Sequence, residues 1–220
     1  RLLLSKDATI REIHHRVKNN LQTISSLLRL QARRLESPEA KAAIQESVRR
    51  IRTIALVHET LSRETGEDVA FIEIVRPLLR LVEEGLQSPD RPVRFIVQGD
   101  GGRLPATVAT PLSVVLTELL QNAVDHGFPE GSAGGTVVVE LGGTDDDIEI
   151  KVINDGRVLD SAFDLNGVTG LGLSIVRTLV TTELNGSILI RAGVAEDFIA
   201  VGIEDHRSGD GTVVQLSLPR

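Results

Sequence analysis

Apolar residues recur every three or four positions through the first part of the chain, a pattern that predicts helices with one buried face. The first run contains Ile10, Ile13, Val17, Leu21, Ile24, Leu28 and Leu35. It stops at Ser37 and Pro38, where the serine can cap a new helix and the proline can occupy its first turn. A second run continues through Ile44, Val48, Ile51, Ala55 and Leu61, up to Gly66. Two long helices joined by a short turn predict an antiparallel hairpin, and a hairpin encloses too little core alone, so we expect a homodimeric four-helix bundle.

The first helix carries a dense polar cluster, residues 12–22, that includes two adjacent histidines. At about 100° per residue, His14 lies roughly 55° from the centre of the apolar stripe and His15 roughly 155° from it. His14 is therefore expected to pack at the flank of the core, whereas His15 shares an exposed face with Asn19 and Gln22. The residues alone leave two interpretations open, an ordinary solvated face and a site of chemistry. A lone exposed histidine is more often only a surface residue.

The remainder of the chain mixes helical and strand patterns. Helices are predicted at about 72–84, 106–126 and 171–184, and strands at about 92–97, 136–141, 148–153, 187–191, 198–203 and 212–218. This order predicts an α+β fold in which helices cover one face of a mixed, mainly antiparallel sheet. We expect two domains, the hairpin over residues 1–66 and the α/β sandwich over residues 67–220.

Composition narrows the class of protein. With 41% apolar and 25% charged residues, the chain of 220 residues is typical of a globular protein with a core. No apolar run has membrane-spanning length and no signal peptide is evident, so we expect a cytoplasmic protein without a membrane segment. The absence of cysteine excludes disulfides and thiolate metal sites. Because the first residue is Arg1, we expect a fragment of a longer protein with a domain upstream.

Charge separates the two parts of the chain. Residues 1–66 carry 13 Lys and Arg against 7 Asp and Glu, whereas the remainder carries 11 against 24. A basic region can bind nucleic acid, but no aromatic residue accompanies these charges for base stacking. A basic surface that meets an acidic protein partner is the favoured interpretation, with no direct contact to nucleic acid.

Glu118, Asn122 and His126 follow one another at intervals of four in the predicted helix 106–126. This spacing places them on one helix face. A carboxamide oxygen is a suitable ligand for Mg²⁺, and a nearby glutamate can orient water or accept a proton. The same residues also suit an ordinary polar surface, and the two interpretations are equally weighted on this motif alone.

The segment Asn154-Asp155-Gly156 ends a predicted strand. A side-chain oxygen at this place can accept the adenine amino proton, and a glycine permits close approach of the base. Asn, Asp and Gly are also common in turns, so this segment is weak evidence by itself.

The segment Thr169-Gly170-Leu171-Gly172 opens a predicted helix. Free N–H groups at a helix start can bind phosphates. The spacing is neither a Rossmann fingerprint nor a Walker A loop. We expect the preceding residues, 157–168, to form a lid over a nucleotide.

Together, these three segments resemble the N, G1 and G2 boxes of the GHKL (Bergerat-fold) ATPases, in the order found in sensor histidine kinases. Residues 14–22, His-His-Arg-Val-Lys-Asn-Asn-Leu-Gln, resemble the H-box of the HisKA_2 type. The resemblance covers nearly the whole chain. It is strongest to cytoplasmic actinobacterial kinases, which often carry GAF or PAS sensory domains upstream.

The resemblance implies an enzyme, an ATP- and Mg²⁺-dependent protein-histidine kinase that passes its phosphoryl group to an aspartate of a response regulator. It implies that His15 is the phospho-acceptor, that Asn122 is the Mg²⁺ ligand and that Glu118 is a candidate base. Asn19 is a candidate for positioning water in the reverse, phosphatase-like reaction. The expected nucleotide contacts are His126, Asn154, Asp155, Gly156, Thr169, Gly170, Leu171 and Gly172.

Several residues depart from the family pattern. The adenine-contacting Asp of the G1 box falls on Asn154, which leaves Asn154 and Asp155 as alternatives, and its second Gly falls on Val158. Asp125 stands where many kinases carry a cation, which favours His126 or an arginine as the phosphate partner. Arg16 replaces the acid that follows the phospho-histidine in other kinase classes, so the base for His15 is left open.

The alternative from another class is a non-catalytic dimeric scaffold, a degenerate kinase with a vestigial nucleotide site. The departures at Asn154 and Val158 motivate it. Nucleotide binding discriminates the two hypotheses.

Overall fold

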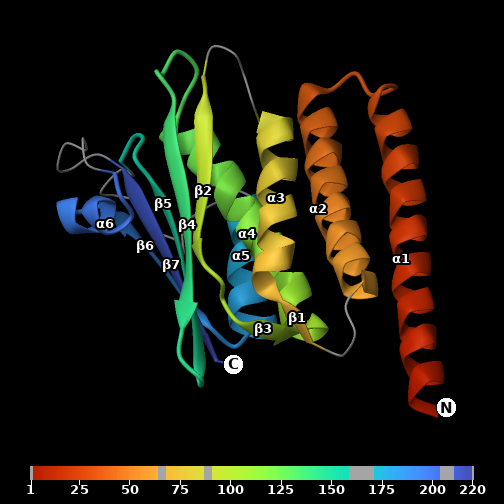
Figure 1. Ribbon diagram of the computed structural model, residues 1–220. Helices are drawn as coiled ribbons and strands as arrows, with labels where there is room; N and C mark the ends of the chain where they lie inside the picture. Colours follow the sequence, from red (N-terminus) through yellow and green to blue (C-terminus); the bar gives the residue numbers. More distant parts are fainter. Residues whose placement is uncertain (1, 64–67, 87–90, 159–170, 204–210, 220) are drawn as a thin grey trace.

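The computed structural model describes residues 2–63, 68–86, 91–158, 171–203 and 211–219. Its first elements are two long antiparallel helices, α1 (Leu2–Ala32) and α2 (Pro38–Arg63), which lie side by side at one edge of the molecule (Figure 1). The Ser37 hydroxyl accepts a hydrogen bond from the Ala40 N–H at 3.2 Å and so caps α2. The predicted helical hairpin is confirmed. The predicted domain boundary at residue 66 lies outside the described residues.

A five-stranded sheet forms the centre of the rest of the chain, in the order β2-β4-β5-β7-β6. Its strands are β2 (Val93–Gly99), β4 (Gly135–Gly143), β5 (Asp147–Asn154), β6 (Ser187–Ala192) and β7 (Thr212–Pro219). Only the β2–β4 pair among these is parallel. The mixed, mainly antiparallel sheet is therefore as predicted. Two short strands that the sequence pattern did not predict, β1 (Asp68–Ala70) and β3 (Arg103–Pro105), pair with each other beside it.

Three helices cover one face of the sheet: α3 (Phe71–Leu86), α4 (Ala106–Gly127) and α5 (Leu171–Thr178). Alternation along β5 explains why this face is buried, because Ile148, Ile150 and Val152 all belong to the main core. On α4, every residue from Leu112 to Leu120 is buried, since the helix lies between the sheet and α2. Figure 1 shows the resulting order of layers, with the sheet, then α4 and α3, then α2, and α1 outermost.

The predicted strand at 198–203 is wrong. The chain there forms a short helix, α6 (Ala195–Ala200), on the opposite face of the sheet (Figure 1). Phe198 is fully buried against Val138 and Val213, so tertiary packing overrides the β-like run of apolar residues. The Asp197 carboxylate accepts a hydrogen bond from the Val194 N–H at 2.9 Å and thereby starts the helix. The prediction that helices cover only one face is corrected accordingly.

The predicted helix 171–184 also differs in its second half. After Thr178 the backbone widens into a π-helical turn, η1 (Leu179–Glu183), in which the Leu184 N–H donates to the Leu179 carbonyl at 2.9 Å. Two residues after the end of this turn, Asn185 has the left-handed φ of 50°. Among the described residues, no helix combines the length and apolarity that crossing a membrane requires.

Candidate functional site

A cavity of about 330 Å³ lies between α4, α5 and the covered face of the sheet. Its lining is mainly apolar with a few polar side chains, which is typical of small-molecule sites. The lining residues are Leu119, Asn122, Ala123, His126, Gly127, Val152, Asn154, Arg157, Val158, Leu173, Ile190, Thr212 and Val214. The structure thus brings together residues of the predicted N-box helix and of the predicted G1 segment.

Asn154, at the end of β5, lines this cavity and is only 4% exposed. Its Oδ1 accepts a hydrogen bond from the Gly156 N–H at 3.2 Å, which orients the amide. Asp155 does not line the cavity. Its Oδ1 accepts the Thr136 N–H at 2.7 Å and so joins the end of β5 to the start of β4. Of the two alternatives left open by the sequence, the geometry favours Asn154 as the residue that meets a ligand.

Asn122 and His126 line the cavity from α4, as their shared helix face predicts. The Asn122 amide nitrogen is buried and has no hydrogen-bond partner among the described residues. A buried polar group without a partner is costly, so its presence in a cavity indicates a place for a polar ligand. Asp125 is exposed and accepts a hydrogen bond from Gln121 Nε2 at 2.7 Å, outside the cavity.

Two glycines allow the end of α4 to approach the end of β5. A Cβ on Gly156 would lie 2.2 Å from the Gly127 carbonyl oxygen, and a Cβ on Gly127 would lie 2.7 Å from Asn154 Oδ1. The Arg157 N–H donates to the same Gly127 carbonyl at 2.7 Å. Gly156 is therefore needed for a backbone contact beside the cavity, and it does not itself line the cavity.

Glu118 lies one turn before Asn122 but not in the cavity. It is 6% exposed, and it forms an ion pair with Arg50 of α2. A Cβ on Gly172, near the start of α5, would lie 2.7 Å from Glu118 Oε2. The residue expected as a base is thus held between the hairpin and the start of α5.

The remaining segment of the predicted nucleotide site is only partly described. Thr169 and Gly170 lie outside the described residues, as does most of the predicted lid, and nothing is described of the Leu171 side chain. Arg157 and Val158, the first residues of the predicted lid, line the cavity.

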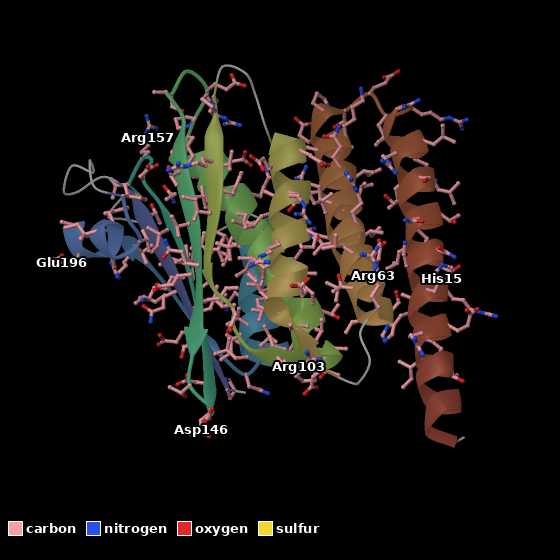
Figure 2. The ribbon with its side chains drawn as sticks, in the orientation of Figure 1. His15, Arg63, Arg103, Asp146, Arg157 and Glu196 are labelled. Carbon is pink, nitrogen blue, oxygen red and sulfur yellow. The ribbon has the colours of Figure 1, made fainter. Side chains whose placement is uncertain are left out.

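His15 lies on α1 and is exposed, as predicted. Its Nδ1 is 3.4 Å from Asn19 Nδ2, one turn further along the helix. The nearest carboxylate in sequence, Glu12, instead pairs with Arg16 at 2.7 Å, and this hydrogen bond lowers the pKa of the Glu12 carboxyl. Figure 2 shows His15 on the outermost helix and Arg157, a cavity residue, at the opposite side of the molecule.

His14 packs inside the hairpin, as the helical phase predicts. Its Nδ1 lies 2.8 Å from Nδ1 of His58 on α2, so the N–H of one ring donates a hydrogen bond to the ring nitrogen of the other. Burial lowers the pKa of both rings, and for His58 the nearby His14 adds to this effect. The two histidines are 44 residues apart in sequence, and no local pattern indicates this pairing.

Sequence reasoning missed several residues that the structure brings to the site. Thr212 faces the cavity because it is the register partner of Asn154 across the β5–β7 pair. Arg157 was included only in the lid, and Arg50 was not singled out at all. The partners of Thr212 and Arg50 are distant in sequence, and no local pattern indicates such pairs.

The cavity residues fit a nucleotide. Val152, Leu173 and Val214 offer apolar walls for a planar base, and Asn154 supplies a hydrogen-bonding group between them. The unpartnered amide of Asn122 lies on the α4 side, where a more polar part of the ligand would bind.

Family comparisons agree with this architecture. Residues 12–85 match the HisKA_2 histidine kinase family, and residues 107–220 match the family of histidine kinase-, DNA gyrase B- and HSP90-like ATPases, HATPase_c. The chain therefore belongs to the sensor histidine kinases of the HisKA_2 and HATPase_c type, which confirms the resemblance seen in the sequence.

The particular kinases that it resembles include PdtaS of mycobacteria. The sensor histidine kinase PdtaS of Mycolicibacterium smegmatis is 46% identical over 219 residues, which cover 100% of this chain and 41% of the relative. PdtaS of Mycobacterium tuberculosis is 48% identical over 191 residues, which cover 87% of this chain and 38% of the relative. The chain thus spans about two fifths of the length of these relatives.

Solved structures support the fold. The histidine kinase domain of the blue-light-activated kinase EL346 of Erythrobacter litoralis superposes with a TM-score of 0.66 at 22% identity. The match covers 99% of this chain and 93% of that one. The helical hairpin and the α/β part are thus found together in a solved structure of the same fold.

Proposed function

We propose that this chain is the catalytic core of a sensor kinase that transfers the γ-phosphoryl group of ATP to His15. The observation that carries the proposal is the pairing of a nucleotide-sized cavity containing Asn122 and Asn154 with an exposed histidine on the hairpin. Neither feature alone requires phosphoryl transfer, but a histidine kinase needs both.

Asn154 and Asn122 have separate tasks in this proposal. Asn154 hydrogen-bonds the adenine edge with an amide that Gly156 orients, and the apolar side chains around it exclude water from the base. Asn122, whose amide nitrogen has no partner among the described residues, contacts the phosphates in this proposal, with His126 and Arg157 as further polar contacts at the same cavity. Mg²⁺, when bound through Asn122 and the phosphates, would neutralise the charge that develops during transfer.

His15 acts as the nucleophile through a ring nitrogen. An imidazole carries a free lone pair at neutral pH, so positioning rather than strong activation suffices. Because Asn19 lies beside Nδ1, we assign Nε2 as the nitrogen that meets the phosphate. We also assign to Asn19 the positioning of a water molecule in the reverse, phosphatase-like reaction.

The hairpin offers surfaces for two protein partners. The apolar residues Ile13, Ile24, Leu27 and Leu30 on α1 are about half exposed or more, which supports burial against a second copy in a homodimer. The net basic charge of residues 1–66 suits the acidic pocket of a response-regulator receiver domain, whose aspartate would take the phosphoryl group.

We place the division between the hairpin and ATPase domains at residues 66–67. We also propose that the protein acts in the cytoplasm.

Incubation with γ-labelled ATP and Mg²⁺ tests the proposal. Labelled protein should lose the label in acid and keep it in base, as a phosphohistidine does. His15→Gln should abolish labelling, and the matched control His14→Gln should retain it. Label that disappears only in His14→Gln would contradict the assignment of the acceptor.

The scaffold remains the second candidate because Asn154 and Val158 replace family residues at the nucleotide cavity. Calorimetry with a non-hydrolysable ATP analogue separates the two functions. The kinase requires Mg²⁺-dependent binding, and its absence would favour the scaffold.

A further inference from the structure

A buried ion pair connects the hairpin to the α/β part. Arg50 of α2 donates from Nε to Glu118 Oε1 at 2.8 Å and from Nη2 to Glu118 Oε2 at 3.0 Å. The side chains of Arg50 and Glu118 are 14% and 7% exposed. This bidentate ion pair fixes the guanidinium and the carboxylate in one geometry.

Further groups complete the junction. Thr53 follows Arg50 by three residues on α2, and Thr117 directly precedes Glu118 on α4. The hydroxyls of Thr53 and Thr117 are hydrogen-bonded at 3.1 Å, and both side chains are buried. Glu46, one turn before Arg50, also accepts a hydrogen bond from its Nη2. Burial and the nearby Glu118 raise the pKa of Glu46, although Arg50 opposes them. We call the Arg50–Glu118 and Thr53–Thr117 pairs together the α2–α4 contact.

This contact has a consequence for the proposed reaction. Glu118 directly precedes the cavity residue Leu119 on α4, but both of its oxygens are engaged by Arg50. His15 lies on the outermost helix, α1, whereas the cavity lies beyond α2, between α4, α5 and the sheet (Figures 1 and 2). Transfer to His15, in the same chain or in a second copy, therefore requires the cavity and the acceptor ring to approach each other.

We propose that the α2–α4 contact is autoinhibitory, and that Arg50 is a positioning residue that holds the kinase with Glu118 withdrawn. Phosphoryl transfer requires that α4 separate from α2 and that Glu118 leave Arg50. The inference rests on the proposed function, because it concerns access to the same site.

The energetics of the Arg50–Glu118 ion pair favour a contact that can open over a permanent one. A buried ion pair gains little net stability, because its attraction is offset by the loss of hydration of both groups. Removal of Arg50 alone is different, since it leaves the Glu118 charge buried and uncompensated in the docked arrangement. The docked state is then penalised, whereas a separated state, in which Glu118 is hydrated, is not.

A reversible cross-link tests the inference. The chain has no cysteine, so Thr53→Cys with Thr117→Cys introduces the only pair. The hydroxyl oxygens of Thr53 and Thr117 are 3.1 Å apart, so cysteines at these two positions are close enough to form a disulfide. Oxidised protein should bind the ATP analogue as the reduced protein does, but autophosphorylate at least about tenfold more slowly, with full recovery on reduction.

The outcomes are distinguishable. Equal rates in the oxidised and reduced states would overturn the inference, as would failure of the bridge to form, because the docked arrangement would then not be populated. If the reduced protein binds nucleotide but never becomes phosphorylated, the proposed function fails instead.

Arg50→Gln supplies the converse test without a cross-link. Autophosphorylation should rise by about fivefold or more at unchanged affinity for the ATP analogue. The matched control is Arg52→Gln on the same helix, whose side chain is exposed, and its rate should stay that of the wild type. An unchanged or lower rate in Arg50→Gln, with its thermal unfolding like that of the control, would overturn the inference.

Discussion

Replacing Gly156 with alanine should destabilise the α/β part, and the size of the effect follows from one contact. The new Cβ would lie 2.2 Å from the Gly127 carbonyl oxygen and 2.8 Å from Phe128 Cε1, where ordinary contact begins at 3.4 Å. The two segments must therefore separate by about 1.2 Å, the difference between 3.4 and 2.2 Å. That movement breaks the hydrogen bond of 2.7 Å from the Arg157 N–H to the Gly127 carbonyl.

Overpacking costs about 1–3 kcal/mol and a lost hydrogen bond about 1 kcal/mol, so we expect Gly156→Ala to lower the free energy of unfolding by about 2–4 kcal/mol. Denaturant-induced unfolding measures this change. ATP-analogue affinity should fall as well, because Gly156 orients Asn154. Gly85→Ala is the matched control, since a Cβ there meets nothing within 4 Å and the position is helical.

The control should stay within about 1 kcal/mol of the wild type, on the stabilising side, because alanine favours a helix more than glycine does. If Gly156→Ala unfolds at the same denaturant concentration as the wild type, the close approach of the two segments is not what the structure indicates, and the reasoning is refuted.

Three other predictions concern the cavity, the hairpin and the dimer. Asn154→Ala should weaken binding of the ATP analogue by about tenfold, whereas Asp155→Ala should change it by less than about twofold and mainly lower stability; calorimetry showing equal losses would contradict this. Burial lowers the pKa of His14 and His58, so the folded hairpin favours the neutral form of both rings. Their contribution to the free energy of unfolding is complete above the ordinary histidine pKa of about 6.5, and it is lost as the pH falls through the lowered pKa values of the folded state. Thermal unfolding of His58→Gln should therefore decline less steeply on acidification than that of the wild type, and parallel curves would refute it. Leu27→Glu, at a position that is 57% exposed in the single chain, should shift sedimentation from dimer to monomer, and an unchanged dimer would show that this face is not the interface.

Local periodicity was sufficient to predict the hairpin and the orientation of its histidines. Helical phase alone separates His14 from His15, since two adjacent residues differ by about 100° around the axis. The same kind of signal was present but unused in β5. Ile150, Val152 and Asn154 alternate onto one face of that strand, which indicates Asn154 over Asp155 as the cavity residue.

Long-range pairing explains what could not be predicted. Arg50 and Glu118 are 68 residues apart in sequence, and nothing near either one indicates the other. The error at 198–203 has a similar origin, because the burial of Phe198 depends on the outer face of the sheet, which forms from distant strands. Glu118 was predicted as a candidate base, and its position in the structure depends on how the hairpin docks.

The position of the phosphoryl group after incubation with Mg²⁺ and ATP tests the central claim most directly. Peptide mapping by mass spectrometry at neutral pH would preserve a phosphohistidine. We expect a single phosphoryl group on His15 in the wild type and none in Asn122→Ala. A phosphoryl group on any other residue, or a protein that binds ATP and remains unmodified, would contradict it.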